Sequence, residues 1–261
     1  MCLILLAWQA HPGYPLVVAA NRDEFFRRPT APLHYWDDAS NVLAGRDLSA
    51  GGTWMGLTRQ GRFAALTNFR GVEKNRESTA AAPTRGRLVS DFLTSVDSAE
   101  NYLTKLAQKA DAYNGFNLLC GRLNDGLWYF SNRGGIEPQL LETGIYGLSN
   151  HLLDTPWPKV AQGKSDMAKA LAALPHEAPL RELLHDENIH QDAKLPRTGI
   201  SLEWERALSA AFVRRPEYGT RSSSLLLLDR QNTVCFDEQT WHSAARLSNR
   251  KRYRFKLQSK S

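Results

Sequence analysis

The sequence predicts an α+β fold in which two mostly antiparallel β-sheets stack face to face and helices cover their outer surfaces. The expected elements come as strands, two helices, strands, two or three helices, and strands, without the βαβ alternation of a parallel sheet. The run Leu225 to Leu228 is apolar on both faces, which is typical of a strand covered on each side. Because no internal repeat or long linker interrupts the chain, we expect one domain over residues 1–261.

The chain begins with a predicted β-hairpin. Apolar runs at 2–8 and 15–20 flank a His-Pro-Gly turn at 11–13, which favours two antiparallel strands. The second run ends in four polar residues, Asn-Arg-Asp-Glu at 21–24, and the hairpin returns them to the neighbourhood of Cys2. Once the initiator methionine is removed, Cys2 supplies a thiol and a free α-amine beside these charged groups, which is the outline of a catalytic corner.

The segment after this hairpin is predicted to be irregular before a second hairpin forms. Residues 25–40 are rich in proline, aspartate and tryptophan and are expected to form a loop. Residues 45–54 are expected to form a glycine-rich bend that lacks the spacing of a phosphate loop. Apolar runs at 53–57 and 62–67 predict the second hairpin, and the polar, alanine-rich stretch 71–83 predicts an exposed loop.

Helical and strand patterns then follow each other in blocks to the end of the chain. Apolar spacing predicts two helices after Thr84, the second capped by Asp97 or Ser98. The other expected elements are strands at 116–123, 126–131, 139–141 and 144–148, helices at 158–174, 180–185 and 202–213, and strands at 222–229, 233–237 and 253–257.

Composition and charge exclude several classes of protein. No run approaches the roughly 20 apolar residues that span a bilayer, so we expect that this is not an integral membrane protein. The net charge is +6, and the densest basic segment lies at 246–256. No nucleic-acid motif accompanies this segment, so an edge strand with charges facing solvent is favoured over a nucleic-acid site. Three cysteines without CxxC spacing favour a reducing, cytoplasmic location and no metal site.

Six short motifs are spread along most of the chain, namely Met1-Cys2-Leu3-Ile4, Asn21-Arg22-Asp23-Glu24, Gly51-Gly52-Thr53-Trp54, Leu148-Ser149-Asn150, Asp154-Thr155-Pro156-Trp157-Pro158-Lys159 and Gly219-Thr220-Arg221-Ser222-Ser223. Together they resemble the motifs of the NRDE family, also called the transport-and-Golgi-organization protein 2 family. The resemblance implies the fold of the N-terminal-nucleophile (Ntn) hydrolases, a four-layer αββα sandwich, which agrees with the order of elements above. Some members of the family are reported to bind and move haem inside cells.

The function implied first is therefore a cytoplasmic haem-binding and haem-trafficking protein, with haem as its small-molecule cargo and no other cofactor. No CxxCH or other haem signature selects the iron ligand. The candidate ligands are Cys2, His11, His34, His151, His242 and Met55. Four tryptophans suit either an apolar pocket or the core, namely Trp8, Trp36, Trp54 and Trp157. The residues expected to contact the ligand are Asn21, Glu24, Trp54 and His151.

The alternative function is an N-terminal cysteine hydrolase that cleaves an amide bond of a small acylated substrate. Cys2 would supply the nucleophile, and its α-amine, with an ordinary pKa of about 7.7–8.0, would supply the base. Arg22 would lower the pKa of the thiol or hold a substrate carboxylate, and Asp23 or Glu24 would orient the amine. The remaining candidates are Asn68 and Asn150 as oxyanion donors and Arg221 as an anion site.

This chemistry resembles that of the bile-salt and penicillin-V acylase branch, which also starts at Cys2. In that branch an arginine and an aspartate lie three residues apart after the second strand. Here Arg22 and Asp23 are adjacent, which leaves their individual roles open. The candidates also have structural interpretations: Cys2 as a small buried hydrophobe, 21–24 as a strand-end turn held by salt bridges, and the asparagines and Arg221 as capping or surface residues.

Overall fold

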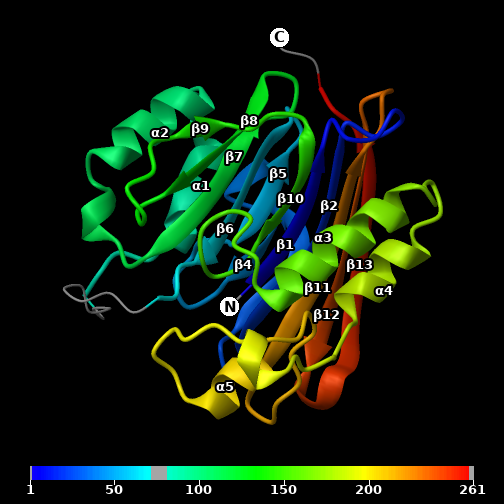
Figure 1. Ribbon diagram of the computed structural model, residues 1–261. Coiled ribbons are helices and arrows are strands. Elements are labelled where there is room, and N and C mark those ends of the chain that lie inside the picture. The colour runs from blue at the N-terminus through cyan, green and yellow to red at the C-terminus, as the bar shows by residue number, and fades with distance from the viewer. Residues whose placement is uncertain (1, 72–80, 259–261) are drawn as a thin grey trace.

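Two β-sheets stack against each other and helices cover both outer faces, which confirms the predicted four-layer αββα sandwich (Figure 1). The structure is a computed structural model and describes residues 2–71 and 81–258. On one outer face lie α1 (Gly86–Thr94) and α2 (Ala99–Ala107), and on the other lie α3 (Pro158–Leu171) and α4 (Ala178–Leu184). Shorter helical segments are α5 (Leu202–Ala207) and the 3-10 turns Ala110–Ala112, Asp192–Lys194 and Ser243–Ala245.

Neighbouring strands of the described residues pair antiparallel in both sheets. The six-stranded sheet has the order β10 (Gly144–Leu148), β1 (Cys2–Trp8), β2 (Leu16–Phe25), β11 (Tyr218–Leu228), β12 (Thr233–His242) and β13 (Arg246–Lys256). The seven-stranded sheet has the order β3 (Thr30–Trp36), β4 (Ala39–Asp47), β5 (Met55–Thr58), β6 (Arg62–Asn68), β7 (Phe116–Arg122), β8 (Gly126–Ser131) and β9 (Gln139–Leu140).

Alternation along the central strands sends successive side chains to opposite layers. In β1, Ile4 and Leu6 belong to the core between the sheets, whereas Leu3 and Leu5 belong to the core beneath α3 and α4. The leucine run 225–228 of β11 divides between the same two cores and is buried on both faces, as predicted. A third core lies between the seven-stranded sheet and the helices α1 and α2.

The loop predicted at 25–40 and the bend predicted at 45–54 are wrong in part, because β3 and β4 occupy most of this stretch. β3 is an edge strand, and an edge strand tolerates Pro32 because one of its sides makes no ladder hydrogen bonds. The register between β3 and β4 also shifts twice, which hides the alternation on which a sequence-based prediction relies. Of the loop predicted at 71–83, residues 72–80 lie outside the described residues.

Both predicted hairpins are confirmed, as the pairs β1–β2 and β5–β6. The Ser98 hydroxyl caps α2 by accepting a hydrogen bond of 3.1 Å from the backbone N–H of Asn101. The remaining errors concern the ends of elements. The helix predicted at 202–213 ends at Ala207, and β11 begins earlier than predicted, at Tyr218.

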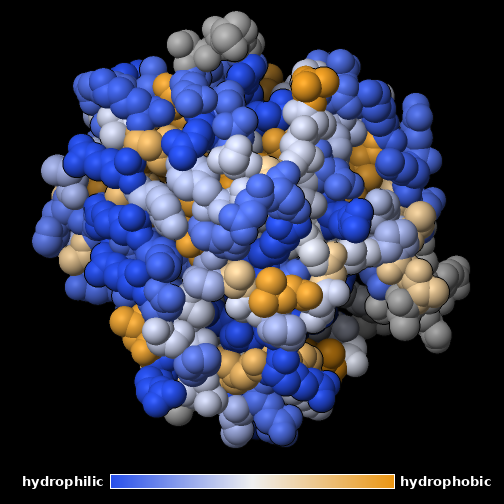
Figure 2. Space-filling model, turned by 180° about the vertical axis from the view of Figure 1, so that it is seen from behind, coloured by the Kyte–Doolittle hydropathy of each residue, from blue (hydrophilic) through white to orange (hydrophobic). Residues whose placement is uncertain are grey.

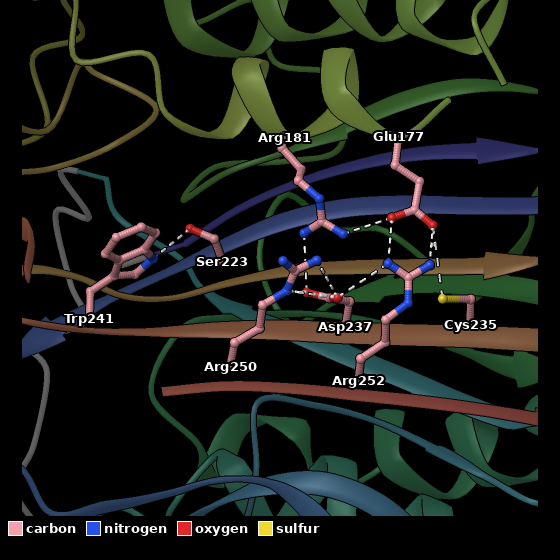
Figure 3. Close-up of polar contacts among 8 residues, drawn as sticks. All are labelled: Glu177, Arg181, Ser223, Cys235, Asp237, Trp241, Arg250 and Arg252. Carbon is pink, nitrogen blue, oxygen red and sulfur yellow. Dashed lines mark hydrogen bonds and ion pairs between the residues drawn. The ribbon is translucent and has the colours of Figure 1, made fainter. Parts of the chain in front are cut away.

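The basic segment forms β13, the edge strand of the six-stranded sheet, as predicted, but two of its arginines do not simply face solvent. Asp237 of β12 is 0% exposed and accepts hydrogen bonds from Arg250 at 2.9 Å and from Arg181 of α4 at 3.1 Å. Glu177 accepts from Arg252 at 2.6 Å. Figure 3 shows these groups as one ionic network, which ties the edge strand to the helix layer.

No helix within residues 2–71 and 81–258 is long and apolar enough to cross a membrane. Seen from behind the view of Figure 1, the surface is largely hydrophilic, and its hydrophobic residues form small scattered groups (Figure 2). Scattered apolar residues are ordinary on a folded surface, so this face gives no sign of a large apolar interface.

Candidate active site

A cavity of about 600 Å³ lies between the two sheets. Its walls come from β1, β2, β11 and β12 on one side and from β3, β4, β6 and the start of α1 on the other. Four of the lining residues, Cys2, Arg22, Ser222 and Thr240, lie side by side on adjacent strands. The inner face of the six-stranded sheet therefore gives the cavity a continuous polar wall.

Cys2 lies at the start of β1, directly opposite Arg22 of β2, and is 8% exposed. The backbone N–H of Asp23 donates a hydrogen bond to the sulfur of Cys2, and the Ser149 hydroxyl donates to the carbonyl oxygen of Cys2 at 3.0 Å. Burial raises the pKa of the thiol and so does the charge of Asp23, whereas the charge of Arg22 lowers it. A thiolate here therefore depends on the cations around it.

The four polar residues that end the apolar part of β2 alternate between the cavity and the helix layer. Arg22 and Glu24 lie on the inner side, line the cavity and form an ion pair of 3.7 Å. Asn21 and Asp23 lie on the helix side, where they are 0% and 1% exposed. Strand alternation thus divides the quartet into two pairs with different surroundings.

Asn21, which was predicted to bind the ligand, does not line the cavity. Its amide nitrogen donates hydrogen bonds to the carbonyl oxygens of Leu184 at 2.7 Å and Ala211 at 2.8 Å. Leu184 ends α4, and Ala211 follows α5. Asn21 therefore attaches the helix layer to the sheet.

Asp23 is a buried carboxyl that also reaches the cavity wall. Its carboxylate accepts a hydrogen bond of 2.8 Å from the Thr220 hydroxyl, and its carbonyl oxygen accepts one of 3.2 Å from the Tyr218 hydroxyl. Burial raises the pKa of Asp23, whereas the charges of Lys159 and Arg22 and the hydrogen bond from Thr220 oppose this rise. The carboxyl is thereby held close to the thiol in a position where it can orient an amine.

The two predicted oxyanion donors have different positions. Asn68 ends β6 and lines the cavity. Asn150 is 0% exposed and does not line the cavity, and its amide nitrogen donates to the carbonyl oxygen of Asn68 at 2.9 Å. The arrangement supports a donor role for Asn68. Asn150 holds the backbone of Asn68 through this bond, and its predicted donor role stays a prediction.

Arg221 lines the cavity, but its guanidinium is largely used within the protein. Its Nη1 donates to the carbonyl oxygens of Phe25 at 2.9 Å and Arg28 at 3.0 Å, and its Nη2 donates to the Thr30 hydroxyl at 3.1 Å. These contacts hold the turn between β2 and β3. Arg221 therefore has a structural role in the cavity wall, and the anion-binding role stays a prediction.

Trp54 and Glu24 line the cavity, where a ligand would meet them, whereas His151 does not. The His151 ring packs between Phe69 and Trp157, with ring centroids 4.8 Å and 5.8 Å away. Burial lowers the pKa of His151, which keeps the imidazole neutral at physiological pH. His151 therefore lies apart from the other predicted ligand contacts, and its ligand-binding role stays a prediction.

Of the six candidate iron ligands, only Cys2 lines the cavity. Met55 is buried in the core between the sheets, and His34 lies on the edge strand β3. His11 lies between β1 and β2, and His242 ends β12. In the part of the chain that the structure describes, no group of three or more His, Cys, Asp or Glu side chains is placed to hold a metal ion.

Arg85, just before α1, lines the cavity although no motif in the sequence marks it. One of its nitrogens donates to the carbonyl oxygen of Gly115 at 2.9 Å. Burial lowers the pKa of Arg85, whereas the nearby Cys2 and Glu24 raise it. Arg85 is thus a second cation beside the thiol, and its position in a polar loop carries no signal that distinguishes it from a surface residue.

Glu238 of β12 is the other unpredicted cavity residue. It is 5% exposed and accepts a hydrogen bond of 2.7 Å from the backbone N–H of Leu33 on β3. Burial raises its pKa to about 7, although this hydrogen bond opposes the rise. The sequence does contain a pattern that points to Glu238: Val234, Phe236 and Glu238 are spaced two residues apart and so lie on the same inner face of the strand. The strand was predicted to end one residue too early to include it.

The comparisons with known proteins agree with the resemblance read from the motifs. The family model described as Transport and Golgi organisation 2 matches residues 1–243. The chain is 38% identical to the Transport and Golgi organization protein 2 homolog of Bos taurus, over 92% of this chain and 93% of that protein. It is 35% identical to the Homo sapiens homolog, again over 92% of this chain and 93% of that protein.

Among solved structures, the Caenorhabditis elegans N-acylethanolamine-hydrolyzing acid amidase ortholog is similar in fold, with a TM-score of 0.51 at 8% identity. The similarity covers 87% of this chain and 92% of that one. The stacked sheets and their helices are accordingly Ntn-hydrolase-like. Since the family model and both relatives match most of its length, the chain belongs to the Transport and Golgi organisation 2 family.

Proposed function

We propose that the protein is an N-terminal cysteine hydrolase that cleaves an amide bond of a small acylated substrate. The observation that carries this proposal is the pairing of Cys2 with Arg22 in the wall of a cavity of about 600 Å³. That volume suits a small molecule. The fold is also one on which an amidase is built, in the nematode protein.

The proposed reaction begins with removal of Met1, which frees the α-amine of Cys2 to accept the thiol proton. The thiolate attacks the substrate carbonyl carbon and forms a C–S bond. Collapse of the tetrahedral intermediate breaks the C–N bond, and the α-ammonium returns its proton to the leaving amine. Water then hydrolyses the thioester and releases the acid. Arg22 stabilises the thiolate by its charge, and Asn68 donates to the oxyanion.

We place this activity in the cytoplasm. Cys2, Cys120 and Cys235 are all free thiols. A reducing compartment keeps such thiols from forming disulfides, and the proposed nucleophile needs a reduced sulfur.

Haem handling is the second candidate, and one observation favours it. Cys2 shares the cavity with Arg22 and Arg85. A thiolate can ligate haem iron, and arginines can bind the propionates. We place it after hydrolysis, reversing the order that the sequence implies, because every histidine candidate and Met55 lie outside the cavity lining.

Protein expressed without an N-terminal tag tests the hydrolase proposal. Intact-mass measurement shows whether Met1 is removed, and a panel of N-acyl aminomethylcoumarins of increasing acyl length reports amide cleavage by fluorescence. We expect a processed N-terminus and an activity that falls by at least about 10³-fold in Cys2→Ala. Cys235→Ser is the matched control and should keep the activity. A retained Met1, or equal rates for wild type and Cys2→Ala, would overturn the proposal.

A further inference from the structure

Glu238 is a buried carboxyl in the wall of the cavity, and the proposed chemistry does not use it. It is 5% exposed, and its Oε1 accepts the hydrogen bond of 2.7 Å from the backbone N–H of Leu33. Ser224 lies directly opposite on β11, and its hydroxyl opposes the rise in the pKa of the carboxyl. A carboxylate can accept about four hydrogen bonds, so these two neighbours leave part of its capacity unused.

The unused capacity lies at Oε2, on the side of the carboxyl that Gly45 faces. Gly45 belongs to β4 of the other sheet and also lines the cavity. A Cβ atom at this position would lie 3.7 Å from Oε2 of Glu238 and 3.2 Å from the carbonyl oxygen of Ala31. Because glycine has no side chain, Oε2 stays uncovered. A ligand in the cavity can therefore reach it.

Two other carboxylates of the cavity wall have cations of their own. Glu24 forms an ion pair of 3.7 Å with Arg22, and Asp47 forms one of 2.6 Å with Arg28. Both pairs line the same cavity as Glu238. The charges of these groups are therefore balanced within the protein.

Glu238 has no such partner. Within residues 2–71 and 81–258, no basic side chain lies within ion-pair distance of its carboxyl. Arg46, which follows Gly45 in the chain, donates two hydrogen bonds of 2.6 Å to Asp38 instead. A buried carboxylate is costly unless a cation or further hydrogen-bond donors compensate its charge. The carboxyl of Glu238 thus lacks a compensating group that a ligand can supply.

Strand register sets the distance between Glu238 and the proposed nucleophile. One row across four adjacent strands holds Cys2, Arg22, Ser222 and Thr240. Glu238 lies two residues from Thr240 along β12. With strands about 4.8 Å apart and a rise of about 3.3 Å per residue, Cys2 and Glu238 are about 16 Å apart. The two residues therefore contact well-separated parts of a ligand in the same cavity.

We propose that Glu238 determines specificity by binding a protonated amine of the substrate, remote from the amide bond that is cleaved. The ammonium supplies the missing positive charge and donates a charge-assisted hydrogen bond to Oε2. An extended chain advances about 1.2 Å per bond, so about eight bonds between the amine and the scissile carbonyl carbon span about 10 Å. Contacts at the two ends account for the remaining distance. The inference rests on the proposed function, because it names the class of substrate.

The amine can belong to the acyl part or to the leaving part of the substrate, and two matched pairs of amides distinguish these sources. In 8-aminooctanamide and nonanamide, an ammonium or a methyl group ends the acyl part. In N-acetyl-1,6-diaminohexane and N-heptylacetamide, the same two groups end the leaving part. Isothermal titration calorimetry of Cys2→Ala measures their binding without turnover. In at least one pair, the amine should bind at least about tenfold more tightly than its methyl counterpart.

Three further variants, each made in the Cys2→Ala protein, assign this preference to the carboxyl. Glu238→Gln keeps the shape of the side chain without its charge, so the preference for the amine should disappear. Glu137→Gln is the matched control, because Glu137 is exposed and outside the cavity lining, and it should keep the preference. Gly45→Ala keeps the charge but places a methyl group beside Oε2, so it should reduce the preference.

Two results would overturn the proposal. One is equal binding of amine and methyl compounds in both pairs, and the other is a preference that persists in Glu238→Gln. If Glu238→Gln does not fold, Gly45→Ala decides, and an unchanged ratio of the two affinities would reject the role of Glu238.

Calorimetry separates this inference from the proposed function, because it reports binding whether or not the protein cleaves an amide. If the amine is preferred but wild type cleaves neither 8-aminooctanoyl nor nonanoyl aminomethylcoumarin nor any other amide of the panel, the hydrolase proposal fails and the amine site stands. If wild type cleaves these amides and neither pair shows a preference, the amine site fails and the hydrolase proposal stands.

Discussion

Asn150 donates a hydrogen bond of 2.9 Å to the carbonyl oxygen of Asn68. The two asparagines have the same predicted role, yet only one of them faces the cavity. Asn150 acts on the site through the backbone of Asn68, and the adjacent Ser149 does the same for the backbone of Cys2. The segment after β10 thus supports both sides of the proposed reaction centre.

This difference predicts distinct effects of two alanine substitutions. Asn68→Ala should lower kcat roughly 10²–10³-fold with little change in KM, because an oxyanion donor acts mainly in the transition state. Asn150→Ala should lower the free energy of unfolding by about 1–3 kcal/mol, because it leaves the buried carbonyl of Asn68 without its donor. Steady-state kinetics with the coumarin amide and urea denaturation measure the two effects. An Asn68→Ala variant that changes only KM would contradict the donor role.

The buried Glu238 should make the stability of the folded protein depend on pH. Its pKa is raised from 4.5 to about 7 in the folded protein, so its contribution to stability is present below pH 4.5 and is lost as the pH rises through 7. The loss amounts to roughly 3 kcal/mol. Glu238→Gln removes this loss, so the variant should gain stability relative to wild type between pH 5 and pH 8.

Urea denaturation of both proteins at these two pH values checks the expectation for Glu238. Glu137→Gln is the matched control, because Glu137 is exposed and its substitution should change stability equally at both pH values. A stability difference between Glu238→Gln and wild type that is the same at pH 5 and pH 8 would mean that Glu238 does not titrate in this range.

The ionic network of Figure 3 predicts a stability loss on removing its central charge. Asp237→Asn should lower the free energy of unfolding by about 2 kcal/mol, less than the loss of a fully buried pair, because Arg250 and Arg252 are 45% and 46% exposed. Arg254→Gln on the same strand is the control and should change stability by less than about 0.5 kcal/mol. If the two substitutions change the free energy of unfolding equally in urea denaturation, the ionic network does not contribute to stability.

Haem titration separates the two candidate functions. Cys2 is the only candidate ligand that lines the cavity, and we assign it to hydrolysis. We therefore expect the absorbance spectrum of added haem to be the same with wild type and with Cys2→Ala. A shifted Soret band that disappears in Cys2→Ala but persists in Cys235→Ser would place haem handling first.

Local patterns predicted the part of the fold that brings the site together. Apolar alternation and a His-Pro-Gly turn are enough to form the first hairpin, and the hairpin alone places Cys2 opposite Arg22. The leucine run 225–228 likewise predicts a strand that is buried on both faces, and the structure has one there. In both cases the pattern that predicts the element lies within a few consecutive residues of the chain.

The missed features depend on contacts between separate layers. Glu238 accepts a hydrogen bond from Leu33 on β3 of the other sheet, and Asn21 donates to carbonyl oxygens of the helix layer, so neither shows its partner in its own segment. Asn150 follows a strand as Asn68 does, so the sequence predicts the same donor role for both. The hydrogen bond of 2.9 Å between them joins strand ends that are far apart in the chain, and no local pattern contains it.

The alternation of residues 21–24 has a consequence for the evolution of the family. Arg22 and Glu24 face the cavity, and Asn21 faces the helix layer, whereas Asp23 lies on the helix side and also reaches the cavity wall. Selection on the ligand should therefore act on Arg22 and Glu24, and selection on folding should act on Asn21, while Asp23 is subject to both. A relative that has abandoned the chemistry is expected to vary first at the arginine and glutamate and to keep the asparagine.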